Sequence, residues 1–266
     1  ELKKAIEYYK ELLASREKRL EVVKNELIEV RDKYADPRRT EIVTDDSDLN
    51  IADLIPRHSC VITVSNTGYI KRVPADTYQT QHRGGKGIKS METKDEDYVE
   101  HLFNANSHDL IFFFSDKGFM YWLNVYEIPE GSRTSKGKAI VNMIKVEPGD
   151  RIRAMLTVKK EDFEDDNKFI IMATRRGYIK KTQLSAFANL RRTGLRALVI
   201  EDDDDLIGAD LCENGNEILL SSAYGMACRF NQSDEEIRPM GRTARGVTGM
   251  RFKIDGDYLV SMAVIH

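Results

Sequence analysis

The stretch of this chain with the clearest chemical potential is the heptapeptide Gln81 to Gly87, QHRGGKG. Its three glycines permit positive φ angles and let the backbone approach a ligand closely. Arg83 supplies a planar guanidinium and Lys86 a compact ammonium, and both groups bind phosphate oxygens in proteins. The heptapeptide therefore indicates contact with a polyanion, against the alternative of an ordinary flexible surface loop.

Further basic residues recur at equivalent places along the chain, and we predict that they line one edge of the fold. A continuous row of cations binds backbone phosphates and does not read base edges. The alternative is surface charge that serves solubility. The predicted basic rim consists of Lys71, Arg72, Lys89, Arg133, Lys136, Lys138, Arg175, Arg176, Lys180, Lys181, Arg191, Arg192, Arg196, Arg229, Arg242 and Arg245.

The net charge of −3 conceals a strong segregation of the two signs along the sequence. Four stretches, 57–91, 131–145, 168–200 and 238–253, contain 23 Lys and Arg and one acid, Asp76. The acidic residues gather between these stretches. This alternation predicts a basic stripe on one side of the folded protein, and a local stripe governs phosphate binding more than the net charge does.

The elements that position these cations come from an internal repeat that begins near residue 48. Each unit opens with two apolar strands joined at a turn glycine, as in VITVSNTGYIKRV, and continues into a basic segment with a second glycine. The turn glycines are Gly68, Gly118, Gly177 and Gly225, and the second set is Gly87, Gly137, Gly194 and Gly246. The spacings are 50, 59 and 48 residues in the first set and 50, 57 and 52 in the second.

A period near 50 residues with several short strands in each unit is typical of blades arranged around an axis. We therefore predict an all-β, propeller-like disc in which each unit supplies a four-stranded sheet. The C-terminal segment DGDYLVSMAVIH resembles the opening strand of a fifth unit. The chain is thus expected to stop within a repeat and to be part of a longer protein.

Residues 1–35 show the heptad pattern of a coiled-coil helix. An apolar seam runs from Leu2 to Tyr34, interrupted by Arg16, and Asp36-Pro37 then ends the helix because proline disfavours helical geometry in the residue before it. An amphipathic helix packed on its own domain is the alternative. The predicted domains are residues 1–36, a coiled-coil helix, and residues 37–266, the β domain.

Catalytic and metal-binding motifs are missing from the sequence. GGKG is not a P-loop, and neither a G-x-S-x-G elbow nor an H-E-x-x-H pair occurs. The five histidines and three cysteines lack ligand spacing, and the acidic run Asp202 to Asp205 is expected to be a solvated loop. No run of 18 apolar residues or secretory leader is present, which indicates a cytoplasmic protein. Trp122, the Phe112–Phe114 run and Phe119 are expected in the core.

These residues together resemble the C-terminal domain of bacterial DNA gyrase A subunits. QHRGGKG is similar to the A-box of that family, QRRGGKG, with His82 in place of an arginine. Lys33 to Ile42, KYADPRRTEI, resembles the family's junction between coiled-coil helix and wrapping domain. The resemblance implies a β-pinwheel, a disc that commonly has six blades and exchanges strands between neighbours. It assigns the A-box role to Gln81, His82, Arg83, Gly84, Gly85, Lys86 and Gly87.

The function that the resemblance implies is non-specific binding, bending and wrapping of double-stranded DNA, close to the nucleoid. Wrapping lets the holoenzyme, an A2B2 assembly with the gyrase B subunit, introduce negative supercoils by ATP-dependent strand passage. The family's cleavage tyrosine follows an arginine, and no tyrosine here does. This fragment is therefore expected to have no catalytic activity and no cofactor, since ATP and Mg²⁺ act elsewhere in the holoenzyme.

Two other functions are compatible with the fold. A topoisomerase IV subunit has a similar pinwheel with a degraded or absent A-box, which the nearly intact heptapeptide disfavours. A propeller that serves as a protein-interaction platform should present aromatic and apolar residues on its rim, whereas the rim predicted for this chain is cationic. A propeller hydrolase would need convergent carboxylates or a metal site, and neither is apparent in the sequence.

Overall fold

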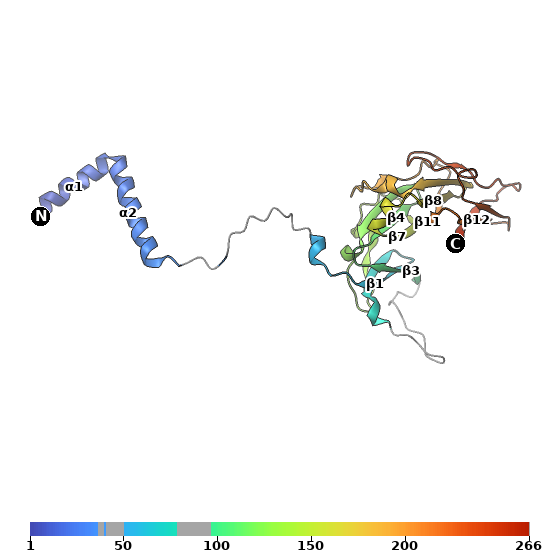
Figure 1. The fold of residues 1–266 in the computed structure, drawn as a ribbon, viewed down its shortest axis with the longest axis horizontal. Helices are drawn as coiled ribbons and strands as arrows, with labels where there is room; N and C mark the ends of the chain where they lie inside the picture. Colours follow the sequence, from blue (N-terminus) through green and yellow to red (C-terminus); the bar gives the residue numbers. More distant parts are fainter. Residues whose placement is uncertain (37–39, 41–50, 79–96, 266) are drawn as a thin grey trace. The chain divides into compact units, whose positions relative to one another are not determined.

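The computed structural model describes residues 1–36, 40, 51–78 and 97–265. The chain divides into two compact units, residues 1–49 and residues 50–266 (Figure 1). The first unit is helical in its described part, and the second consists of antiparallel sheets with short 3₁₀ turns. The predicted all-β class of the second unit is confirmed.

The N-terminal unit contains two helices, α1 (Leu2–Ala14) and α2 (Arg16–Tyr34), where the sequence predicts one. Ser15 separates them in an extended conformation, with φ −111° and ψ 122°, and its hydroxyl accepts a hydrogen bond of 3.4 Å from the backbone N–H of Lys18. Serine favours this N-cap role because its side chain satisfies a helical N–H that has no carbonyl partner. The prediction of an unbroken helix is wrong at this residue, although the helical extent is correct.

Four antiparallel sheets make up the second unit. In spatial order, the strands of the first are β3 (Val99–Asn106), β1 (Ser59–Ser65), β2 (Tyr69–Pro74) and β6 (Lys138–Ala139). Those of the second are β10 (Leu195–Arg196), β5 (Phe119–Asn124), β4 (Leu110–Ser115) and β7 (Ile152–Val158). The third consists of β11 (Leu206–Glu213), β8 (Lys168–Thr174), β9 (Tyr178–Gln183) and β14 (Val247–Thr248). The fourth consists of β13 (Ala227–Asn231), β12 (Glu217–Ser222) and β15 (Leu259–Ile265).

None of the first three sheets is supplied by a single repeat unit, contrary to the sequence prediction. Each of the first three hairpins pairs on one side with the strand that follows the basic segment of its own unit, and on the other with a two-residue strand from the next unit. The strands β6, β10 and β14 are exchanged in this way, as the resemblance implies. The C-terminal strand β15, expected to open a fifth unit, instead pairs with β12 in the fourth sheet.

The strand order places the exchanged strands on the outside of the fold. The strands β3, β7, β11 and β15 form one edge of each sheet, and β7 contacts β11 while β11 contacts β15. These strands therefore face one another on the inside, and the sheets follow one another in chain order (Figure 1). The opposite edges, formed by β6, β10, β14 and the segments that lead into them, are called the perimeter below.

Three hydrophobic cores fill the spaces between consecutive sheets. Strand β4 contributes to two of them, because alternate side chains point to opposite faces of a strand. Phe112 and Phe114 lie in the core shared with the third sheet, whereas Ile111 and Phe113 lie in the core shared with the first. All four are fully buried, which confirms the prediction that the phenylalanines pack in the core. Burial on both faces explains the continuous apolar run.

Glycines make the strand exchange possible. Gly137 and Gly246 precede β6 and β14 and have φ angles of 81° and 100°, in the left-handed region that favours glycine. A Cβ at Gly137 would lie 2.5 Å from the carbonyl oxygen of Ile70, and one at Gly246 would lie 2.4 Å from that of Ile179. Any side chain at these positions would therefore push the exchanged strand away from its hairpin.

Candidate nucleic-acid interface

A cation stacked on an aromatic ring recurs at three consecutive sheets along the perimeter. Each ring belongs to the residue directly after the turn glycine of a hairpin, and each cation comes from the exchanged segment of the next unit. The pairs are Lys136 on Tyr69 at 3.8 Å, Arg196 on Phe119 at 4.4 Å and Arg245 on Tyr178 at 4.1 Å, measured to the ring centroid. Stacking holds a cation in place and leaves its N–H donors available at the ring edge.

Several other predicted rim cations are at least partly exposed and have no carboxylate partner within the described residues. Arg133 and Lys138 lie around the first exchanged strand, and Arg191 and Arg242 lie in the loops before the second and third. Arg175 stacks on Tyr258 at 4.1 Å. With Lys136 and Arg196, these residues are the strongest candidates for binding an anion, because no acid in the described part of the chain pairs with them.

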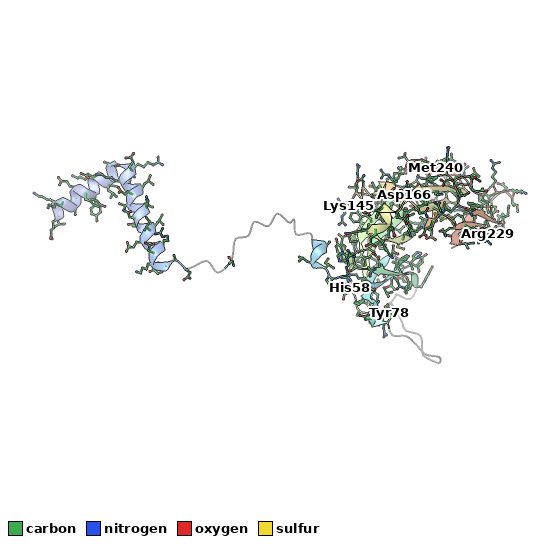
Figure 2. All side chains as sticks on the ribbon, viewed as in Figure 1. His58, Tyr78, Lys145, Asp166, Arg229 and Met240 are labelled. Carbon is green, nitrogen blue, oxygen red and sulfur yellow. The ribbon has the colours of Figure 1, made fainter. Side chains whose placement is uncertain are left out.

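The remaining exposed or half-buried cations of the predicted rim are paired with acids. The pairs are Arg72 with Glu130 at 2.9 Å, Arg176 with Asp203 at 2.8 Å, Arg192 with Glu127 at 2.7 Å, Arg245 with Glu201 at 2.5 Å, and Arg229 with Glu217. Figure 2 labels Arg229 on β13. Folding thus brings carboxylates among the cations, although the sequence keeps the two signs apart. The rim is less uniformly positive than predicted, although exposed pairs of this kind are weak.

Three lysines of the predicted rim, Lys71, Lys180 and Lys181, are fully buried and cannot reach a ligand on the surface. Lys71 donates hydrogen bonds to the carbonyls of Ser132, at 3.0 Å, and Arg133. Lys181 donates to the carbonyl of Gln232 at 2.9 Å and pairs with a carboxylate of the same loop at 2.7 Å. These ammonium groups bind backbone of the neighbouring unit, so their role in this structure is to hold perimeter loops in place.

Lys180 makes the most extensive of these contacts. Its ammonium donates to the carbonyl of Ala197 at 2.6 Å, to that of Ala244 at 3.2 Å and to that of Arg242. Burial lowers the pKa of Lys180 to about 8, with a further contribution from the charge of Arg242. The group therefore joins two perimeter loops, residues 188–197 and 241–245, from consecutive units.

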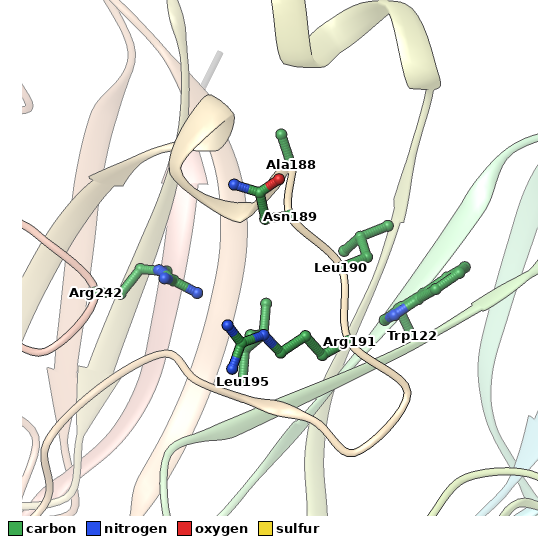
Figure 3. A pocket seen from close by; sticks show the side chains of 7 residues that line it. All are labelled: Trp122, Ala188, Asn189, Leu190, Arg191, Leu195 and Arg242. Carbon is green, nitrogen blue, oxygen red and sulfur yellow. The ribbon is translucent and has the colours of Figure 1, made fainter.

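A cavity of about 630 Å³ lies between these two loops (Figure 3). The guanidinium groups of Arg191 and Arg242 reach into it from opposite sides, and Asn189 lies at its edge. Trp122 forms part of its wall, and the buried indole N–H has no acceptor within the described residues. Arg192 stacks on the indole at 4.5 Å. The cavity thus combines two unpaired cations with a flat apolar wall.

Acidic residues near the hairpin turns have structural partners. Asp204 is buried and accepts the backbone N–H of Arg176 at 2.9 Å, and Asp205 pairs with Lys117 at 3.2 Å. The acidic run Asp202 to Asp205 is therefore not the simple solvated loop that the sequence predicts. Within the ranges that the structure describes, no three His, Cys, Asp or Glu side chains lie together in a way that could hold a metal ion.

Comparison with protein families gives a match to the model described as DNA gyrase C-terminal domain, beta-propeller. Four successive segments match it, residues 61–106, 109–159, 168–213 and 216–266. The chain belongs to the DNA gyrase C-terminal domain family. Each matched segment holds one hairpin together with the inner strand that follows it, so the fourth match ends with β15, in agreement with the four sheets.

Individual relatives of this gyrase C-terminal domain support the assignment. The DNA gyrase A subunit of Clostridium acetobutylicum is 42% identical over 249 residues, which cover 94% of this chain and 29% of that protein. A solved C-terminal domain of DNA topoisomerase IV aligns with a TM-score of 0.66 at 28% identity, over 80% of this chain and 62% of that one. A solved DNA gyrase A C-terminal domain aligns with a TM-score of 0.60 at 26% identity, over 78% and 65%.

The chain spans 20 to 30% of the length of the gyrase A subunits it matches. The chain therefore corresponds to one part of such a subunit. Neither α1 nor α2, nor any other helix in the described part of the chain, combines the length and hydrophobicity of a membrane span. The A-box, Gln81 to Gly87, and Lys89 of the predicted rim lie outside the described residues.

The aromatic partners of the cations in this gyrase C-terminal domain were not predicted from the sequence. Tyr69, Phe119 and Tyr178 each follow a turn glycine directly, so a signal was present in the repeat itself. The fourth hairpin has Met226 at this position, and no cation–ring pair is found there among the described residues. The prediction of Trp122 and Phe119 in the core holds in part, because both are partly buried and pack against a core, while Trp122 also lines the cavity and Phe119 carries Arg196.

Proposed function

We propose that this domain binds, bends and wraps double-stranded DNA along its perimeter without sequence preference. The observation that carries the proposal is the repeated cation–aromatic pair at three consecutive sheets. Repetition along the outside of stacked sheets gives a curved row of fixed positive groups, and a duplex that follows such a row must bend. Side chains of this kind contact phosphates and do not read base edges.

The salt dependence of binding follows from the same contacts. Each phosphate that a cation neutralises releases condensed counterions, so the logarithm of the affinity falls with the logarithm of salt concentration by roughly 0.9 per contact. The unpaired cations, such as Arg133, Lys138 and Arg196, can contribute fully. Cations paired with acids must first exchange a carboxylate for a phosphate and contribute less.

In the full subunit, we propose, the wrapped segment is presented to the strand-passage gate, so that ATP-driven passage yields negative supercoils. The A-box residues Gln81 to Gly87 complete the wrap, in line with their resemblance to the family motif. The cleavage tyrosine lies elsewhere in the gyrase A polypeptide, and the ATP site lies in the B subunit of an A2B2 assembly in the cytoplasm.

A topoisomer ligation assay on this chain tests the proposal. Nicked circular DNA is sealed in the presence of the protein, and a shift in linking number reports both bending and the hand of the wrap. Replacing Arg83 and Lys86 together by alanine should abolish the shift but leave most of the DNA affinity, because the other cations remain. A wild-type chain that binds DNA without changing the linking number would contradict wrapping, and affinity that is indifferent to salt would favour a protein-interaction platform.

A topoisomerase IV subunit is the second candidate, because the solved topoisomerase IV domain gives a slightly higher TM-score than the solved gyrase domain. The A-box-like heptapeptide favours gyrase. Supercoiling of relaxed plasmid by the reconstituted enzyme distinguishes the two, since we expect negative supercoiling from a gyrase and relaxation alone from a topoisomerase IV.

A further inference from the structure

The cavity between the loops 188–197 and 241–245 brings together two perimeter arginines that have no carboxylate partner within the described residues. Arg191 and Arg242 extend into it, and no carboxylate lines it within the described part of the chain (Figure 3). Elsewhere on the perimeter, exposed arginines such as Arg176, Arg229 and Arg245 are paired with acids. Two guanidinium groups that share a cavity without a counter-charge repel each other, and an anion between them would relieve the repulsion.

Hydrogen bonds from a buried lysine fix the backbone of the two loops that carry these arginines. The buried ammonium of Lys180 bonds the carbonyl of Arg242 itself and, on the other loop, the carbonyl of Ala197 just after β10. A direct backbone bond of 3.4 Å from the N–H of Val199 to the carbonyl of Ala244 joins the loops again. The backbones that carry the arginines are therefore fixed relative to each other, and a preorganised pair of donors loses less entropy on binding.

The chemistry of the cavity fits phosphate oxygens. Guanidinium groups bind phosphate with paired, charge-assisted hydrogen bonds. The amide of Asn189 and the indole N–H of Trp122 are neutral groups on the same cavity wall, and the indole N–H has no acceptor within the described residues. A carboxylate ligand would also suit two arginines, but the perimeter position favours a polyanion that runs past several units.

We propose that this cavity is a phosphate-binding site. Arg191 and Arg242 together bind the DNA backbone there, where it crosses from the second sheet to the third. The inference rests on the proposed function, since it assigns one anchoring site to the duplex on the perimeter. The loops belong to exchanged segments of consecutive sheets, so a backbone that follows the perimeter passes the cavity. Lys180 acts as a positioning residue, because it is buried and its hydrogen bonds go to the loops that carry the arginines.

Trp122 makes the site directly measurable. It is the one tryptophan of the chain, so tryptophan fluorescence reports the surroundings of this ring, which is part of the cavity wall. We expect titration of the complete chain with a 40-base-pair duplex to change this fluorescence, with the same midpoint as a gel-shift titration under the same conditions. In the double variant R191Q and R242Q, the fluorescence change should be lost and the slope of log affinity against log salt should fall by about two.

The matched control is R133Q. Arg133 precedes Gly137 by four residues, as Arg242 precedes Gly246, and it is also without a carboxylate partner among the described residues. This variant should lower the salt slope by about one contact and keep the fluorescence change. Circular dichroism and the melting temperature should be those of the wild type in both proteins, because the changed side chains lie at the surface.

The outcomes separate this inference from the proposed function. The proposed phosphate-binding site is refuted if the wild type binds the duplex without a change in fluorescence and the double variant keeps the wild-type salt slope. In that case DNA is bound elsewhere on the perimeter. If no duplex binds at low salt, the proposed function itself fails. A further titration of the wild type uses inorganic tripolyphosphate. If Trp122 fluorescence changes with tripolyphosphate but not with the duplex, the ligand of the cavity is a soluble phosphate and not DNA.

Discussion

Replacing the buried lysine at the centre of the perimeter contacts, Lys180→Met, gives the sharpest test of how the perimeter is built. Methionine is also unbranched and fills most of the same space, so the main change is the loss of the ammonium. Three hydrogen bonds to carbonyls disappear. The carbonyl of Ala244 keeps its bond from Val199, whereas those of Ala197 and Arg242 have no other donor within the described residues.

Two opposing contributions set the size of the change in stability at pH 7. An unsatisfied buried acceptor costs about 1 to 3 kcal/mol, so the two carbonyls cost on the order of 4 kcal/mol. The wild type bears the cost of burying a charge, which the fall of the Lys180 pKa from 10.5 to about 8 puts on the order of 3 kcal/mol. The variant should therefore be less stable by about 1 kcal/mol, which lowers the melting temperature by about 2 to 4 °C in a domain of this size.

The decisive measurement is how the difference in the free energy of unfolding between wild type and variant changes with pH. Because the pKa of Lys180 is lower in the folded state, the unfolded chain holds more protons between about pH 8 and pH 10.5. The free energy of unfolding of the wild type therefore gains a contribution that rises with pH in this window, by on the order of 1 kcal/mol for each unit. Methionine does not titrate, so the gap between wild type and variant should widen as the pH rises from about 7.5 to about 9.5.

Urea unfolding followed by Trp122 fluorescence at several pH values measures the gap. The exposed lysine variant Lys138→Met is the control, and its stability should parallel that of the wild type at every pH, since Lys138 makes no ion pair among the described residues. A gap that stays constant across this pH range would show that the ammonium is not destabilised by burial. Either a constant or a narrowing gap would refute the reasoning, because a pKa raised by the three carbonyls would change the stability only above about pH 10.5.

Three further substitutions test the perimeter. Glu201→Gln removes the acid that pairs with Arg245, while Arg176 keeps its pair with Asp203, so DNA affinity at low salt should increase and the salt slope steepen, as measured by fluorescence anisotropy; an unchanged affinity would mean that Arg245 does not meet DNA. Gly246→Ala should lower the melting temperature much more than Gly225→Ala, because both glycines have positive φ but a Cβ meets a carbonyl at 2.4 Å only at the former. His82→Arg should strengthen wrapping more at about pH 8 than at about pH 6, since histidine is mostly neutral at the higher pH, and identical wrapping in topoisomer ligation would reject this role.

The repeat, the turn glycines and the all-β class could be predicted from the sequence because they depend on local patterns. The hairpins alternate between apolar runs and glycine turns, and Gly68 and Gly118 have the positive φ angles that such turns require. The pairing of β6 with β2 could not be found in this way, since a strand of two residues has no periodicity. The break at Ser15 was missed because the heptad spacing continues across it, although Arg16 interrupts the apolar seam there.

The predicted site was correct about which segments carry the cations and wrong about which cations are free. Lys71 and Lys180 have the pattern of surface lysines beside a glycine turn, but each lies in a strand that is covered on both faces. Their burial depends on carbonyls supplied about 60 residues later in the chain. The pairing of Arg192 with Glu127 joins residues 65 positions apart and is equally invisible in the pattern of charge along the sequence.

The exchanged strands make the anion-binding surface a property of neighbouring units rather than of single ones. A perimeter cation such as Arg245 is carried by one unit, stacks on Tyr178 of the unit before it, and follows a loop fixed by Lys180 of that same earlier unit. A shift of one sheet against the next would therefore move the cation, its ring and its loop together. The row of positive groups keeps its spacing as long as the sheets stay packed, so the hydrophobic cores between the sheets also set the geometry on which a bound duplex depends.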